Sequence, residues 1–279
     1  ARGKMDARAR LAALVDDGSF REIGKIAGRG SYDEEGNLTG VLPAPFLFGK
    51  ALINGRPVVA TADDFTIRGG AADAGISRKM VQAEKMAHEL KLPLIRMIDG
   101  TGGGGSVKTL EQIGATYIPA VPGWSDVVRN LDTVPVVALA LGPTAGLGAA
   151  RTVASHYSIM VKGLSQIFAA GPAVVDGLGE SYRGSDDHSQ AKEDLGGSGI
   201  HTRNGVVDDE VSSEAEAFAR ARHFLSFMPE YVGQLARRSN CTDPVHRREE
   251  ALLSLVPRQD KQVYSMRRCM EMVFDQGTV

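Results

Sequence analysis

A run of glycines follows an apolar segment near position 100, and its composition suits chemistry done by the backbone. Gly100 to Gly105 read GTGGGG, and Asp99 alone separates them from the apolar run LPLIRMI. Glycine has no side chain, so the N–H groups of such a turn can point at a ligand oxygen without obstruction. Two N–H groups that converge on one point would form an oxyanion hole, which stabilises developing negative charge on a substrate oxygen.

Two phosphate-binding motifs compete with this interpretation. The run satisfies the dinucleotide pattern G-x-G-x-x-G after a predicted strand. The segment that follows, VKTLEQIGATYIPAVPG, has little helical periodicity, and Asp126 opens a predicted helix instead of ending a second strand. A Walker loop fits less well, because Lys108 and Thr109 follow Val107 and not glycine. The backbone-donor interpretation is therefore favoured.

A second turn of small residues has the same layout. In LGPTAGLGAARTVAS a predicted strand runs into Gly142-Pro143, and Ala145 and Gly146 open a predicted helix. The first N–H groups of a helix are unpaired and carry positive dipole, so they are a second candidate for oxyanion donors. Close packing of small residues explains the same composition without any ligand.

The turns must be positioned by helices and strands, and the sequence predicts that these alternate along the chain. Apolar residues recur at helical spacing in five segments, and continuous apolar runs predict strands between them. Asn54-Gly55 predicts a tight hairpin turn between two strands within 41–65. Strands that are apolar on both faces indicate a sheet covered by helices, so the predicted class is α/β. The predicted helices are 5–17, 76–90, 125–131, 145–155 and 213–229, and the further strands are 92–98, 134–142 and 157–161.

Composition excludes several classes of partner. The 279 residues are 43% hydrophobic and carry a formal net charge of -2, which gives no electrostatic reason to expect nucleic acid. No apolar run approaches the roughly 20 residues that span a bilayer, and the charged start ARGKMDARAR is unlike a signal peptide. Only Cys241 and Cys269 are present, which favours reduced thiols and a cytoplasmic location, or the mitochondrial matrix in a eukaryote.

The last residues repeat the first. SMRRCMEMVFDQGTV aligns without a gap on DARARLAALVDDGSF. The matched pairs are Arg267 with Arg8, Met270 with Leu11, Val273 with Leu14, Asp275 with Asp16, Gly277 with Gly18 and Thr278 with Ser19. Chance similarity of two short amphipathic helices is the alternative. If the repeat is real, the chain is the first half of a two-unit protein.

Six motifs follow one another in a recognisable order. They are KMDARARLAALVDDGSF, GRPVVATADDFTIRGGAADAGISRKMVQAEKMA, IDGTGGGG, GPTAGLGAARTVAS, FAAGP and LGGSGIHTRNGVVDDE. With these motifs the chain resembles the N-terminal half of the carboxyltransferase (beta) subunit of biotin-dependent acyl-CoA carboxylases, of the propionyl-CoA and methylcrotonyl-CoA carboxylase type. The resemblance implies a crotonase-like (ClpP/crotonase) fold of stacked ββα units. It also implies an acyl-CoA-binding domain at 1–233, a connection at 234–262 and the start of a second, homologous domain at 263–279.

The resemblance implies a carboxyl transfer that needs no side chain as base. Carboxybiotin releases carbon dioxide, its ureido nitrogen takes the α-proton of the acyl thioester, and the enolate attacks the carbon dioxide. On the family pattern Asp99 and Thr101 precede Gly102 and Gly103, whose N–H groups are the predicted oxyanion hole. This sequence departs from the pattern, since Gly100 is extra and Gly104-Gly105 replace the usual alanine and a larger residue. A register shift would make Gly103 and Gly104 the donors.

Further positions match parts of the family that line the acyl-CoA. Arg68 is a candidate for a CoA phosphate, although a solvent-facing arginine is the alternative, and His201 is interpreted as a residue that orders a loop. The predicted acyl-CoA-binding residues are Arg68, Gly69, Gly70, Thr101, Gly104, Gly142, Ala145, Gly146, Gly171 and Pro172.

The resemblance also implies partners. The expected ones are an acyl-CoA substrate, a biotin carboxylase or biotin carrier subunit that brings the biotin cofactor, and further copies of the chain in a dimer or a trimer of dimers. No metal is expected, because Asp186, Asp187 and His188 have the composition of an exposed loop and the cysteines are not clustered. Two alternatives remain open: a biotin-dependent acyl-CoA decarboxylase subunit, and a non-catalytic scaffold half.

Overall fold

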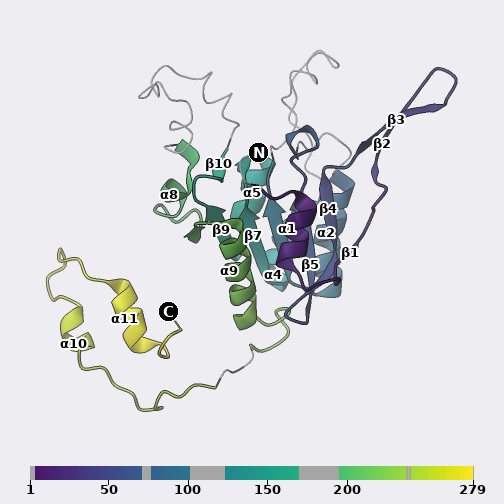
Figure 1. Ribbon diagram of the computed structural model, residues 1–279. Coiled ribbons are helices and arrows are strands. Elements are labelled where there is room, and N and C mark those ends of the chain that lie inside the picture. The colour runs from purple at the N-terminus through teal and green to yellow at the C-terminus, as the bar shows by residue number, and fades with distance from the viewer. Residues whose placement is uncertain are drawn as a thin grey trace, which may run out of the picture. The chain divides into compact units, whose positions relative to one another are not determined.

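The computed structural model describes residues 4–70, 77–100, 123–169, 195–236, 238 and 240–278. They fall into two compact units, Ala1–Ala236 and Arg237–Val279 (Figure 1). None of the helices within these ranges combines the length and the apolar character needed to span a bilayer.

The first unit is built on one large sheet. Within the described ranges, seven strands pair in the order β1-β4-β5-β6-β7-β9-β11. The pairs β1–β4 and β4–β5 are antiparallel, and every later neighbour is parallel, as expected for strands joined by helical crossovers. The strands are β1 (Arg21–Glu22), β4 (Phe46–Ile53), β5 (Arg56–Asp63), β6 (Leu94–Ile98), β7 (Val136–Ala140), β9 (Tyr157–Val161) and β11 (Asp209–Val211).

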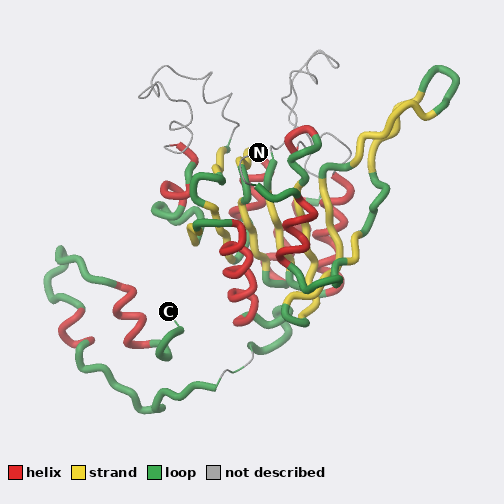
Figure 2. Tube along the Cα trace, in the orientation of Figure 1, coloured by secondary structure: helices red, strands yellow, loops and turns green. Residues whose placement is uncertain are grey.

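Helices cover both faces of this sheet, which confirms the predicted α/β class (Figure 2). Successive residues of a strand point to opposite faces, so each strand contributes to two cores. On β6, Ile95 and Met97 pack on the side of α1 (Ala7–Leu14) and α9 (Glu214–Phe227), whereas Leu94 packs on the side of α2 (Ser77–Leu90). That second face also carries α4 (Trp124–Thr133), and α5 (Leu147–Val153) follows β7.

The hairpin predicted from Asn54-Gly55 is confirmed. Both residues have positive φ, 51° and 75°, as a two-residue turn between β4 and β5 requires. The predicted segment 41–65 was nevertheless too coarse, because its first part is divided between β4 and an earlier strand that ends at Pro43.

That earlier strand belongs to a ribbon that the sequence patterns did not predict. β2 (Gly28–Tyr32) and β3 (Leu38–Pro43) pair antiparallel and project from the sheet (Figure 1). Their residues are mostly polar or glycine, so they lack the apolar alternation by which strands are recognised. A second unpredicted pair is parallel: β8 (Pro143–Ala145) with β10 (Gln166–Phe168). A short helix, α8 (Ser198–His201), follows later in the chain.

The described residues of the second unit form two short helices, α10 (Leu252–Leu255) and α11 (Met266–Val273). Ser265 caps α11 through a hydrogen bond from the Arg268 N–H to its hydroxyl. The domain boundaries predicted above, and the second domain at 263–279, stay predictions.

Candidate active site

Three backbone turns meet at the carboxyl ends of neighbouring parallel strands. β6 is followed by Asp99 and Gly100, and its neighbour β7 is followed by Leu141 and Gly142. A hydrogen bond from Leu141 N to Ile98 O, at 2.9 Å, joins the ends of these two strands. The 3-10 turn η1 (Arg68–Gly70) follows β5, the strand on the other side of β6. Ligands of open parallel sheets bind at such strand ends.

The turn after β5 and the turn after β6 are in direct backbone contact. A Cβ placed on Gly70 would lie 2.8 Å from Asp99 O, and one placed on Gly100 would lie 2.9 Å from Gly70 O. Gly69 and Gly70 also have positive φ, 64° and 71°. No side chain fits between these two stretches of backbone, so Gly70, which is predicted to line the CoA, contacts Gly100 at the start of the glycine run.

The turn of small residues after β7 also contacts the turn after β6. A hydrogen bond joins Ala145 N to Gly100 O at 3.4 Å, and another joins Gly146 N to Phe168 O at 3.1 Å. These two N–H groups already have acceptors and are therefore not free to bind a ligand oxygen. The turn does not open directly into a helix, because β8 intervenes before α5 begins at Leu147.

Asp99 is the polar side chain at the centre of this arrangement. It is 2% exposed, and its carboxylate lies 2.6 Å from Lys4 Nζ and 2.7 Å from Arg10 Nη1. Gly142 packs on the same carboxylate, where a Cβ would clash with Asp99 and Lys4. The side chain that precedes the glycine run is thus fixed in place by two cations.

Lys4, Arg10 and Glu214 were missed as site residues in the sequence. Arg10 Nε and Nη2 donate to Glu214, the first residue of α9. One signal was available, since Arg10 lies on the same face of α1 as the apolar Ala7, Leu11 and Leu14, a position where a charge requires a buried partner.

A second group of buried charges lies on the other side of β6. Arg96 donates to both carboxylate oxygens of Glu84 at 2.8 Å, and Arg151 Nη1 reaches Asp63 Oδ1 at 3.3 Å. Burial raises the pKa of Asp63 against the opposing charge of Arg151. Asp63 also accepts a hydrogen bond from Asp99 N at 3.2 Å, so the two groups meet at the end of β6.

Several predicted site residues lie outside the described part of the chain. They are Thr101, Gly102, Gly103, Gly104, Gly171 and Pro172, together with Asp186, Asp187, His188 and the side chain of Arg68. His201 is described, and its Nε2 lies 3.0 Å from Ile167 O. That contact agrees with the interpretation of His201 as a residue that orders its loop.

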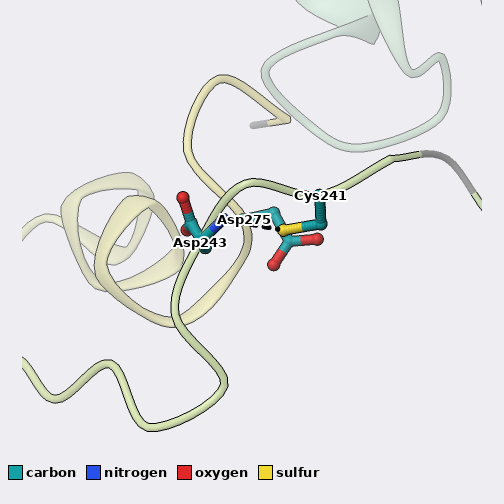
Figure 3. A group of neighbouring side chains, drawn as sticks. All are labelled: Cys241, Asp243 and Asp275. Atoms are coloured by element: carbon teal, nitrogen blue, oxygen red, sulfur yellow. Dashed lines mark hydrogen bonds between the residues drawn. The ribbon is translucent and has the colours of Figure 1, made fainter.

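One group of side chains in the described residues has the spacing of metal ligands, and it lies in the second unit. Cys241, Asp243 and Asp275 offer atoms within 4.8 Å of one another (Figure 3). Asp243 already binds the Arg247 guanidinium and accepts from Gln276 N at 3.0 Å. Its contacts account for its position without an ion.

Comparison with known proteins gives the class to which this fold and site belong. The carboxyl transferase domain model matches residues 1–278. The chain therefore belongs to the carboxyl transferase domain family.

Relatives and solved structures agree with this assignment. The chain is 29% identical to methylmalonyl-CoA decarboxylase subunit alpha of Veillonella parvula, over 99% of this chain and 52% of that protein. It is 28% identical to the mitochondrial propionyl-CoA carboxylase beta chain of Rattus norvegicus, over 99% of this chain and 49% of that protein. It thus spans about half the length of these curated relatives.

A solved structure shows the fold. Transcarboxylase 12S, described as a hexamer with hydrolysed methylmalonyl-coenzyme A bound, superimposes with a TM-score of 0.74 at 27% identity, over 98% of this chain and 51% of that one. The fold is crotonase-like, as the resemblance implied.

Proposed function

We propose that this chain is the acyl-CoA-binding half of a carboxyltransferase that moves a carboxyl group from carboxybiotin to the α-carbon of a short or medium acyl-CoA. The observation that carries the proposal is the meeting of Gly70, Gly100 and Gly142 around a buried, ion-paired Asp99 in a carboxyl transferase domain. Glycine at these three positions lets the backbones that follow β5, β6 and β7 pack closely at one edge of the sheet, where the glycine run begins.

The chemistry assigned to this half is stabilisation of the thioester enolate. Carboxybiotin supplies the carboxyl group. When bound, it would also take up the α-proton, so that a C–C bond to the carboxyl group could replace the α-C–H bond. Negative charge develops on the thioester oxygen, and the N–H groups of Gly102 and Gly103 are the proposed donors to it.

The remaining predicted positions belong to the same proposal. The residues proposed to line the acyl-CoA are Arg68, Gly69, Gly70, Thr101, Gly104, Gly142, Ala145, Gly146, Gly171 and Pro172. For Ala145 and Gly146 the proposed contribution is to shape the channel, because their N–H groups bond Gly100 O and Phe168 O. A biotin carrier and further copies of the chain are the proposed partners.

A proline series tests the donors. Proline at 102, 103 or 104 removes one N–H each, and alanine at the same position adds a side chain but keeps the N–H. Loss of a true donor should lower kcat about 10²- to 10³-fold beyond the alanine control. The assay uses the full-length protein, its biotinylated carrier and acyl-CoAs of increasing length, with product followed by mass.

The pattern of losses also decides the register. Large losses at 102 and 103 support the assignment, and losses at 103 and 104 support the shifted one. Equal effects of proline and alanine at all three positions would overturn the oxyanion hole. Absence of any biotin-dependent carboxyl exchange in the wild-type protein would overturn the function itself.

Decarboxylation is a second candidate, favoured by the 29% identity to the Veillonella parvula methylmalonyl-CoA decarboxylase subunit. The same enolate forms when a carboxyl group leaves the α-carbon, so this half would do the same work in the reverse direction. Supplying methylmalonyl-CoA with the uncarboxylated carrier, and measuring the rate against the forward assay, distinguishes the two directions.

A further inference from the structure

The guanidinium of Arg10 donates more hydrogen bonds than a single ion pair requires. The side chain is fully buried on α1 and makes four hydrogen bonds, of the five that a guanidinium can donate. Nη1 donates to Asp99 Oδ2 at 2.7 Å, Nη2 donates to Leu141 O at 2.7 Å, and Nε donates to Glu214 Oε1 at 2.8 Å.

The partners of Arg10 lie where the two glycine turns begin. Asp99 directly precedes Gly100, and Leu141 directly precedes Gly142. One rigid, planar group therefore holds the ends of both β6 and β7, and Glu214 anchors that group to α9.

The charges in this cluster are matched. Lys4 and Arg10 face Asp99 and Glu214, and all four side chains are largely buried. A buried ion pair is a poor device for stability, because well-packed apolar side chains often stabilise as much or more. The charged cluster fixes the geometry of the strand ends through directional hydrogen bonds, which a cluster of apolar side chains could not do.

We propose that Arg10 is a positioning residue: through Asp99 and Leu141 O it sets the turn after β6 against the turn after β7, and so fixes the backbone from which the glycine run continues. This inference rests on the proposed function. Arg10 does not itself touch the acyl-CoA.

Arg10→Lys tests the proposal because it keeps the charge and removes the planar fork. We expect kcat to fall at least about 10-fold, since displacements of about 1 Å in a site can cost 10²-fold. The KM for acyl-CoA should change less than kcat. Arg8→Lys is the matched control on the same helix, where the side chain is exposed and pairs with Glu22 at 2.8 Å, and it should leave kcat unchanged.

Asp99→Asn and the double variant with Arg10→Lys complete a cycle. If Arg10 acts through Asp99, the double variant should lose little more kcat than the more damaged single variant. Independent, multiplicative losses would overturn the positioning role. So would an Arg10→Lys protein that is less stable yet keeps wild-type kcat.

Hydrogen exchange separates this inference from the proposed function. In Arg10→Lys, amides of both 99–104 and 141–146 should exchange faster than in wild type, and in Arg8→Lys they should not. Unchanged exchange in Arg10→Lys overturns the inference even if carboxyl transfer is confirmed. Faster exchange in a protein without carboxyl transfer supports the positioning role and overturns the function assigned to the turns.

Discussion

The helices α1 and α11 have the same backbone design and opposite environments. Asp6 caps α1 and Ser265 caps α11, and each helix runs for eight residues. The residues after the helices, Val15 and Phe274, have ψ of 166° and 165°. Gly18 and Gly277 then adopt φ of 62° and 79°. The repeat recognised in the sequence is thus also a repeat of local conformation.

The difference between them is burial. On α1, Leu11 is 2% exposed and packs in the core of the sheet, while its counterpart Met270 on α11 is 39% exposed. Caps and a glycine stop therefore specify the helix, and only contact with a sheet specifies which face is covered. The proposed second domain at 263–279 depends on a covering surface for α11.

The largest contrast should appear at Arg10 and its counterpart Cys269. Arg10→Met leaves Glu214 without its buried guanidinium partner and leaves Asp99 paired with Lys4 alone, and it should lower the free energy of unfolding of the first unit by about 3–5 kcal/mol. Cys269→Met should change it by less than about 0.5 kcal/mol. Urea unfolding followed by fluorescence of Trp124, the single tryptophan, measures both. Equal losses would contradict the contrast.

The apolar faces give the next contrast. Leu11→Ala should cost about 2–5 kcal/mol, because it removes a side chain from the core and leaves a cavity. Met270→Ala removes an exposed side chain and should cost about 0.5 kcal/mol or less in this chain. Calorimetry of both variants gives the comparison. If Met270→Ala becomes as costly in a longer chain, α11 is covered there.

The glycine stops should behave alike. Gly18→Ala and Gly277→Ala place a Cβ in the left-handed region, where a non-glycine residue costs about 1–2 kcal/mol. No atom lies within 4 Å of either added Cβ, so no clash adds to this cost. Unfolding of the first unit reports Gly18→Ala, and helix content by circular dichroism reports Gly277→Ala. An unaffected Gly18→Ala protein would show that the stop is dispensable.

The caps should give the smallest effects. Asp6 accepts from Arg8 N at 2.9 Å and from Ala9 N at 2.8 Å, and Asp6→Ala should cost about 1 kcal/mol. Ser265→Ala loses one longer bond, 3.3 Å from Arg268 N, and should mainly reduce helix content in α11. Asp6→Asn keeps an acceptor and is the control for the first variant. Asp6→Ala and Asp6→Asn proteins of equal stability would contradict the role of the cap.

Local patterns predicted the elements whose signals are local. The period of α2 and the Asn54-Gly55 turn are written in adjacent residues, and both were located correctly. The ribbon β2–β3 was missed because its stability comes from pairing and not from an apolar pattern. β8 was missed because three residues carry too little periodicity, and it forms only by pairing with β10.

The residues of the candidate site likewise divide into those that the sequence reveals and those that only the tertiary fold brings together. Glycine turns are visible in a sequence because glycine has a distinctive backbone role, and Gly70, Gly100 and Gly142 follow three neighbouring strands of the sheet. The cluster of Lys4, Arg10, Asp99 and Glu214 is held by hydrogen bonds between residues as far as 204 positions apart. Such pairing depends on the tertiary fold, which spacing alone does not reveal.

The contact between Gly70 and Gly100 has a practical consequence for engineering. Because each backbone occupies the space where the other's side chain would be, neither position tolerates diversification on its own. A mutant library that covers this edge of the sheet should therefore keep both positions as glycine. Otherwise most of its members would be lost to misfolding before selection begins.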